Sequence, residues 1–330
     1  MMKSTTTFLF SAALLGLAAG AAQAAPVTIK FSHVVAANTP KGEAAENFRQ
    51  CVADSMPDKA VVEVYPNSQL YDDDKVLQAM LLGDVQMAAP SLSKFEQYTK
   101  QYRVFDLPFL FDDIKAVDRF QLGETGQGLL KAMQDVGYLG LAYWHNGMKQ
   151  LSANKPLLKP EDAKGLKFRI QESDVLEAQF KALGANPQKM AFGEVYGALQ
   201  QGVVDGQENT YSNIYTKKFY EVQDGITESN HGVLDYLVVT SADFWDGLDD
   251  DVREGLTTCL TQATKFGNDK AQALNDEAKS KIEAAGTEIR VLDDAQRQLW
   301  VDAMKPVWSE FEGDIGKDVM DAAQAANGAS

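Results

Sequence analysis

Strand patterns and helix patterns alternate along most of this chain. Residues 27–35 and 61–66 have the apolar, β-branched composition of strands, and residues 38–56 between them have the pattern of a helix. Thr39 is suited to cap that helix, with Pro40 in its first turn. The second half of the chain has the same alternation of strand and helix patterns. We therefore predict an α/β fold with largely parallel sheets covered by helices.

The first 25 residues have the pattern of a secretory signal peptide. Lys3 carries the one charge, an apolar stretch runs from Phe8 to about Ala19, and small residues end in Ala22-Gln23-Ala24. The apolar stretch is shorter than the roughly 18 residues that a membrane span needs. We expect export to the periplasm and a mature protein that starts near residue 26.

The length of the chain bears on the number of its domains, and its net charge bears on the partners that it can bind. A chain of 330 residues, less the leader, is long enough for two domains. With 31 basic and 47 acidic residues the net charge is −16. Nucleic acids and anionic membranes bind to basic patches, so neither is an expected partner. Any cluster of cations on this acidic background would have to be local.

Two other features bear on how the domains are connected. Residues 241–286 begin as a loop and continue as a helix pattern of more than thirty residues, too long for one small domain, so this helix is predicted to cross between two. Cys51 and Cys259 lie far apart in sequence. In an oxidising compartment they allow one disulfide or two separate buried thiols.

The stretch GLKFRIQESD places Arg169 in an alternating strand pattern that runs into a helix ending near Gly184. Arg169 therefore lies near the carboxyl end of a strand, the edge where open α/β sheets bind ligands. Other polar residues also follow predicted strands: His33, Ser91, Lys149 and Asn209. Lysine and arginine opposite serine and asparagine suit a small anion, because a guanidinium binds a carboxylate through two parallel hydrogen bonds.

Sequence motifs for other kinds of chemistry are lacking. The three histidines, His33, His145 and His231, do not have the spacing of zinc ligands, and we expect neither a metal nor a cofactor. The sequence contains no Walker loop, and no G-x-S-x-G nucleophile motif. We therefore expect a binding protein, while an enzyme acting on organic acids is the rival from another class.

The mature chain resembles, over nearly its whole length, the periplasmic substrate-binding proteins of tripartite ATP-independent periplasmic (TRAP) transporters. The most specific part of the match runs from Gly165 to Gln223. The strand arginine, the stretch PQKMAFGEVYGALQ and the turn VDGQEN stand in the order of that family. The stretches FSHVVAANTPKG, HNGMKQLSA and TESNHGVLDYLVVTS are similar to the sequences of one branch of this family. That branch binds four-carbon dicarboxylates such as succinate, fumarate and malate.

The resemblance implies roles for particular residues. Arg169 would form a salt bridge with a ligand carboxylate, Asn209 would hydrogen-bond the ligand and Phe192 would pack against it. Lys149 or Lys41 would hold the second carboxylate of a dicarboxylate. The remaining predicted site residues are His33, Ser91, Tyr211 and Tyr236. Packing alone is the alternative explanation for the two tyrosines, and a purely structural role is the alternative for His33.

The resemblance also implies an architecture and partners. Two α/β lobes would close around the ligand about a hinge, with a long helix between them. Residues 26–146 and 235–274 would form lobe I, and residues 147–234 and 275–330 would form lobe II. The protein would act as a monomer and deliver its ligand to the small and large membrane subunits of a transporter. A sugar acid or monocarboxylate receptor, and a sensing subunit for a membrane kinase, stay open as alternatives.

Overall fold

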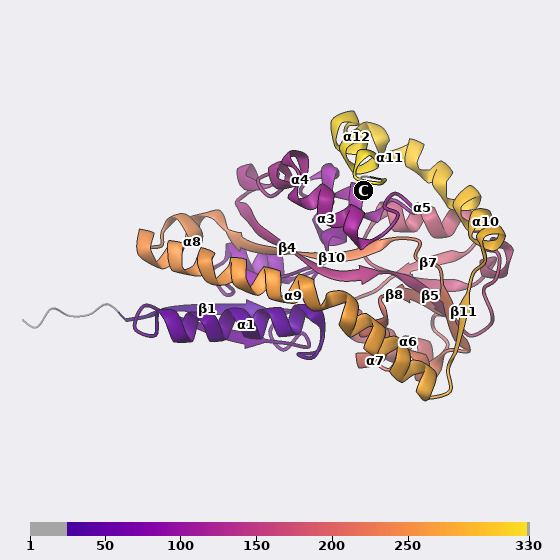
Figure 1. The fold of residues 1–330 in the computed structure, drawn as a ribbon, viewed down its shortest axis with the longest axis horizontal. Helices are drawn as coiled ribbons and strands as arrows, with labels where there is room; N and C mark the ends of the chain where they lie inside the picture. Colours follow the sequence, from indigo (N-terminus) through magenta and orange to yellow (C-terminus); the bar gives the residue numbers. More distant parts are fainter. Residues whose placement is uncertain (1–24, 329–330) are drawn as a thin grey trace, which may run out of the picture.

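The computed structural model describes residues 25–328, so the predicted signal peptide lies outside the described residues, apart from its last residue. Two β-sheets lie side by side along the long axis of the molecule (Figure 1). The first sheet has the order β2-β1-β3-β10-β4, with strands β1 Val27–Ser32, β2 Ala60–Tyr65, β3 Met87–Ala88, β4 Tyr138–Met148 and β10 Val233–Ser241. The second has the order β11-β9-β5-β8-β6-β7, with β5 Gln150–Ala153, β6 Lys167–Ile170, β7 Asn186–Lys189, β8 Gly206–Asn209, β9 Gly225–Glu228 and β11 Glu288–Val291. We call these sheets with their packed helices the first and the second lobe.

Helices cover both sheets. They are α1 Pro40–Ser55, α2 Val76–Leu81, α3 Ile114–Leu122, α4 Glu124–Leu129, α5 Asp174–Ala182, α6 Val195–Gln200, α7 Tyr211–Thr216, α8 Ala242–Asp246, α9 Asp250–Ala284, α10 Asp294–Met304, α11 Trp308–Ile315 and α12 Lys317–Ala325. Short 3-10 helices lie at Leu92–Phe95, Lys100–Asp106, Gln134–Val136, Pro160–Ala163, Phe192–Glu194, Phe219–Val222 and Lys305–Val307. The two-lobed α/β fold predicted from the sequence is confirmed. No helix in residues 25–328 is long and apolar enough to span a membrane.

The sheets are mixed, which corrects the expectation that they are largely parallel. In the first sheet β1 pairs in parallel with β2 and β3, but β10 runs antiparallel to both β3 and β4. The cause is the chain path between the lobes. Strand β4 leads out of the first lobe and β10 leads back into it, so the two neighbouring strands must point in opposite directions.

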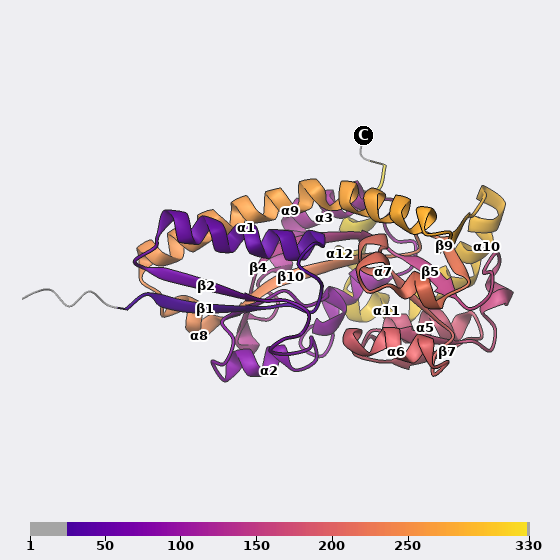
Figure 2. The same ribbon diagram turned by 90° about the horizontal axis from the view of Figure 1, so that it is seen from below.

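Helix α9 confirms the predicted crossing helix. It has 35 residues and runs along both lobes, with α1 beside its first half (Figure 2). Leu256, Cys259 and Ala263 pack in the core of the first lobe, whereas Ala278 and Ile282 pack in that of the second. A single helix therefore contributes to both cores, the first half of α9 to the core of the first lobe and its last turns to the core of the second.

The region where the chain crosses between the lobes is held by polar contacts. His145 Nδ1 lies 2.7 Å from Asp235 Oδ2, which joins β4 to β10. Asn275 of α9 donates to the carbonyl oxygen of Asn146 at 2.6 Å and accepts from the amide of Ser212 at 3.0 Å. Burial by itself would lower the pKa of His145, but Asp235 and Asp118 outweigh it and raise the pKa to about 10. A charged histidine therefore bridges the two crossing strands at neutral pH.

The C-terminal helices return to the first lobe. Phe311 and Ile315 of α11 and Met320 of α12 belong to the same core cluster as Phe105 and Leu237. Part of the segment expected in lobe II therefore packs against the sheet of the first lobe. The residue boundaries given for the two lobes stay a prediction.

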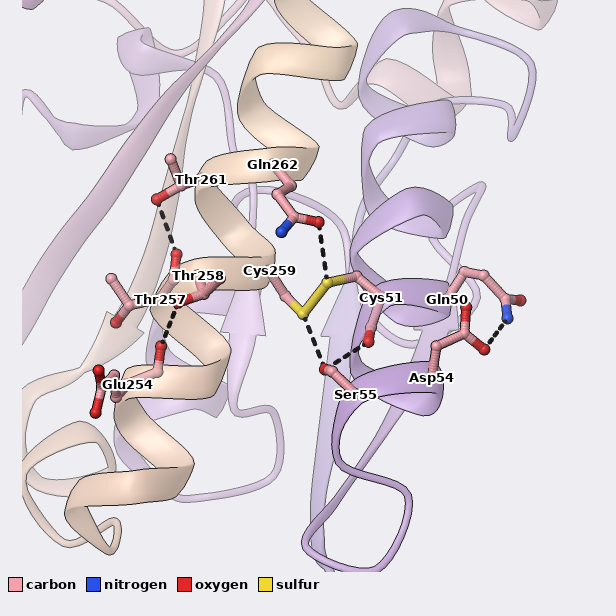
Figure 3. Close-up of a disulfide and its surroundings, with 10 residues drawn as sticks. All are labelled: Gln50, Cys51, Asp54, Ser55, Glu254, Thr257, Thr258, Cys259, Thr261 and Gln262. Carbon is pink, nitrogen blue, oxygen red and sulfur yellow. Dashed lines mark hydrogen bonds between the residues drawn. A yellow bond between two sulfur atoms is a disulfide. The ribbon is translucent and has the colours of Figure 1, made fainter.

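The question of the two cysteines is settled by a disulfide between Cys51 of α1 and Cys259 of α9 (Figure 3). The Cα atoms lie 5.5 Å apart, and Ser55 Oγ lies 3.4 Å from Cys259 Sγ. The same two helices approach closely further along. At Gly267 of α9, an added Cβ atom would lie 2.7 Å from the Cβ atom of Ala44. The disulfide thus fastens a closely packed helix pair within the first lobe.

Replacing both Cys51 and Cys259 by serine should lower the free energy of unfolding by about 2–4 kcal/mol, because the bond closes a long loop in the unfolded chain. Urea unfolding followed by circular dichroism measures this difference. Reduced wild-type protein is the control and should unfold at nearly the same urea concentration as the double variant. Two reactive thiols in denatured, unreduced wild-type protein would contradict the disulfide.

Candidate functional site

Arg169 lies at the carboxyl end of β6, between β7 and β8, and is only 3% exposed. Its Nε and Nη2 donate to the carbonyl oxygen of Met190 at 3.0 and 2.8 Å, which fixes the plane of the guanidinium. Its Cζ lies 6.0 Å from the centroid of the Phe192 ring. Burial lowers the pKa of Arg169 to about 10, against the opposing effect of Glu208, so the group stays charged at neutral pH.

Within residues 25–328, Arg169 forms no ion pair with a carboxylate; the hydrogen bonds of its side chain go to Met190. A buried charge without a direct counterion is costly unless hydrogen bonds or a ligand satisfy it. The arrangement leaves the guanidinium oriented but not neutralised. This is the arrangement expected of a group that binds an anion.

Asn209 ends the neighbouring strand β8. Its Oδ1 accepts from Asn213 Nδ2 at 2.8 Å and from the amide of Thr210 at 3.1 Å. Because these bonds use its oxygen, the Asn209 side chain can offer its Nδ2 hydrogens to an acceptor. Asn213 Nδ2 also lies 3.3 Å from the hydroxyl oxygen of Tyr236, which belongs to the first lobe. The second lobe therefore meets the first lobe at this point.

Lys41 provides a second buried cation, from the start of α1. It is completely buried, its Nζ donates to the carbonyl oxygen of Ala89 at 2.8 Å, and it lies 3.5 Å from the centroid of the Tyr236 ring. Thr39 accepts from the amide of Gly42 and so caps α1, as predicted, which fixes the first turn. Burial lowers the pKa of Lys41 to about 8; Asp73 opposes this shift and Lys217 adds to it.

His33 and Ser91 lie in the same part of the first lobe. Neither ring nitrogen of His33 has a hydrogen-bond partner among residues 25–328, and its ring is buried. Burial, followed by the charge of Lys41, lowers the pKa of His33 to about 3, so the imidazole is neutral. Ser91 forms a bridge to Tyr236, and its Oγ donates to Ser93 Oγ at 3.3 Å.

The structure thus brings most of the predicted residues together. Contacts connect Arg169 to Phe192 within the second lobe, and connect Asn209 through Asn213 to Tyr236 and Lys41 across the lobes. Tyr211 is placed differently. Its hydroxyl donates to Glu228 Oε2 at 2.7 Å, within the core between α7, β9 and α9. Packing accounts for Tyr211 in this position.

Lys149 is also held by a partner of its own. Its Nζ donates to Glu208 Oε1 at 2.8 Å, and Glu208 Oε2 lies 2.7 Å from His231 Nε2. All three side chains are buried. Burial would raise the pKa of Glu208, but Lys149 and His231 outweigh it and hold the pKa at about 2. The charge of Lys149 is therefore neutralised inside the second lobe, which leaves Lys41 as the better placed of the two predicted lysines.

Two residues of this region were not predicted from the sequence: Asn213 and Lys217. Asn213 lies in the short helix α7 and accompanies Asn209, which lies four residues before it at the end of β8, whereas Lys217 directly follows α7, one helical turn after Asn213. That spacing is visible in the sequence and could have led to them. Among residues 25–328, no group of three metal-ligating side chains gathers in a metal-binding arrangement.

The fold and the buried cations between two lobes define a class: a two-lobed solute-binding protein for an anion. Comparison with known proteins gives the family. Residues 31–314 match the bacterial extracellular solute-binding proteins, family 7, and the chain belongs to this family.

Similar proteins include the C4-dicarboxylate-binding periplasmic protein DctP of Vibrio cholerae, which is 59% identical over 91% of this chain and 91% of its own length. A TRAP periplasmic solute binding protein from Shewanella oneidensis with bound succinate is 57% identical, with a TM-score of 0.91 over 92% of this chain and 100% of that chain. One from Pseudomonas aeruginosa with bound L-malate is 48% identical, with a TM-score of 0.85 over 86% of this chain and 100% of that chain.

Replacing Lys149 by methionine should reduce the free energy of unfolding by about 3–5 kcal/mol, because Glu208 is left as a buried charge that has lost its cation. Chemical denaturation measures the change, and the exposed Lys155 replaced by methionine is the matched control. Adding Glu208→Gln to Lys149→Met should restore part of the loss. An unchanged unfolding midpoint in Lys149→Met, together with lost succinate binding, would contradict the structural role given to Lys149.

Proposed function

We propose that this protein is the extracytoplasmic receptor of a TRAP transporter and that it binds a four-carbon dicarboxylate such as succinate, malate or fumarate. The observation that carries this proposal is the pair of buried cations on opposite lobes, Arg169 and Lys41. Neither forms an ion pair with a carboxylate of residues 25–328. Family membership and the similarity to the succinate and L-malate complexes support the same ligand class.

In this proposal, one ligand carboxylate binds the Arg169 fork and an amide hydrogen of Asn209, with the ligand carbon chain against Phe192. The other carboxylate reaches Lys41 near Ser91 and Tyr236. A guanidinium fixed by Met190 pairs with a carboxylate through two hydrogen bonds and loses little further side-chain freedom. The ligand therefore contacts both lobes at once.

Contact with both lobes gives a physical basis for closure. The lobes already meet through Asn213 and Tyr236, and through Gln171 Nε2, which donates to Ser93 Oγ at 3.3 Å. A ligand that binds both lobes favours the closed arrangement by the free energy of the contacts that only this arrangement allows. Small and large membrane subunits would then recognise the closed receptor in the periplasm.

Alternative functions fit the site less well. A sugar acid or another monocarboxylate needs one cation, so a second buried cation on the opposite lobe would have no partner. An enzyme would need a base or nucleophile beside the ligand, and the neutral His33 with its low pKa is a weak base. A sensing subunit for a membrane kinase would share the same binding site, and only its membrane partner would differ. We further propose that the protein acts as a monomer.

Succinate, malate or fumarate should raise the melting temperature of the mature protein. A ligand that binds only the folded state increases the free energy of unfolding by about 2.7 kcal/mol when its concentration is a hundred times its dissociation constant. Differential scanning fluorimetry with these acids and with sugar acids measures the effect. A shift with a sugar acid alone would exclude the dicarboxylate assignment.

Replacing Arg169 by alanine should weaken succinate binding by at least about 2 kcal/mol, which is roughly thirtyfold, since a ligand carboxylate would lose its charged partner. Lysine at this position keeps the charge but not the fork, and should bind with intermediate affinity. Lys167→Ala changes an exposed cation on the same strand and should bind as the wild type does. Isothermal titration calorimetry compares the four proteins; wild-type affinity in Arg169→Ala would refute the role of Arg169.

Succinate affinity should fall as the pH rises above about 8, where Lys41 loses its proton in the free protein. A bound carboxylate favours the charged form and raises the pKa of Lys41, so binding takes up protons in this range. Asp73, Lys217 and His33 are the other titratable groups around Lys41. Calorimetry in buffers of different ionisation enthalpy measures the uptake. Equal uptake by Lys41→Met and the wild type would contradict the role of Lys41.

A further inference from the structure

Lys217 connects the two lobes beside the proposed ligand site. It directly follows α7 in the second lobe, and its Nζ donates to Asn67 Oδ1 at 3.0 Å. Asn67 belongs to the turn after β2 in the first lobe, where its backbone has a φ of 55°. Lys217 Nζ also lies 5.4 Å from the centroid of the Phe192 ring. Phe192 thus has Arg169 and Lys217 as cationic neighbours.

The charges around Lys217 favour an anion. Lys217 forms no ion pair with a carboxylate of the described chain, and neither does Lys41. The charge of Lys217 contributes to the lowered pKa of Lys41, and both lysines contribute to the lowered pKa of the neutral His33, whose ring nitrogens have no partner within residues 25–328. The negative charge of Asp73 partly opposes the lowering of the Lys41 pKa. Three basic side chains therefore converge in a protein whose net charge is −16.

A lysine just after a helix can also serve only to stabilise the last carbonyl groups of that helix. Lys218 also follows α7 and could stabilise the same carbonyl groups, yet it is exposed to solvent and forms an ion pair with Glu221 at 3.0 Å. Lys217 is instead half-buried and reaches the opposite lobe. Stabilisation of α7 explains neither its contact with Asn67 nor its position beside Phe192.

We propose that Lys217, with Lys41 and His33, forms the subsite for the second carboxylate of the ligand, and that Lys217 makes binding selective for acids with a carboxylate at both ends. The proposal rests on the dicarboxylate function proposed above. Arg169 and Lys217 both lie near the Phe192 ring, so a short carbon chain against this ring would place one carboxylate near each cation. Lys217 reaches the first lobe only when the lobes meet, so it couples recognition of the second carboxylate to closure.

The test compares succinate with succinamate, in which an amide replaces one carboxylate, by isothermal titration calorimetry. Lys217→Met should lower the affinity for succinate at least tenfold and leave that for succinamate nearly unchanged, so the preference for succinate falls. Lys217→Arg keeps a cation and should retain the preference. Lys218→Met is the matched control and should behave as the wild type.

Two results would overturn the subsite and leave the dicarboxylate function in place. One is a Lys217→Met variant that binds succinate as tightly as Lys218→Met does. The other is an equal loss of affinity for succinate and succinamate in Lys217→Met, which would mean that Lys217 supports closure but does not bind the second carboxylate. If the wild type binds neither succinate nor succinamate, the dicarboxylate function itself fails and the subsite fails with it.

Discussion

The orientation of one buried cation, Arg169, is the constraint on which the rest of the site depends. Met190 holds its guanidinium with two hydrogen bonds, and Phe192, two residues further on, lies beside it. The segment that follows β7 therefore positions both the proposed anchor, Arg169, and the proposed apolar surface for the ligand, Phe192. Glu208 favours the charged form of Arg169 from a distance while its own oxygens bind Lys149 and His231. The charge is thus stabilised without the formation of an ion pair that a ligand would have to break.

In the proposed binding mode the second lobe supplies Arg169, and the first lobe supplies Lys41 and His33. Binding of an acid with a carboxylate at each end would therefore depend on the relative position of the lobes. Helix α9 and the antiparallel pair of β4 and β10 connect the two lobes, and the disulfide fastens α9 to α1 on the side of the first lobe. The polar cluster of His145, Asp235 and Asn275 lies where these connections cross. Movement of the lobes would act on these connections, while each core stays intact.

The sequence predicted those features that depend on local pattern. The cap at Thr39, the strand around Arg169, the helix end at Gly184 and the long crossing helix all follow from propensity and periodicity. The antiparallel direction of β10 did not, because it depends on the path of the chain between lobes. Pairing of strands distant in sequence also determines the partner of Lys149. Its partner Glu208 lies on β8, which pairs with β5, and this register cannot be read from either segment alone. The contact between Tyr211 and Glu228 could not be foreseen for the same reason, since Glu228 lies on β9.

The most direct test of this account is the crystal structure of the protein with succinate bound. One carboxylate should accept two hydrogen bonds from the Arg169 guanidinium, and the other should lie within hydrogen-bond distance of Lys41 or Lys217, with the carbon chain against Phe192. Succinate bound away from Arg169, or bound to the second lobe alone, would contradict the account.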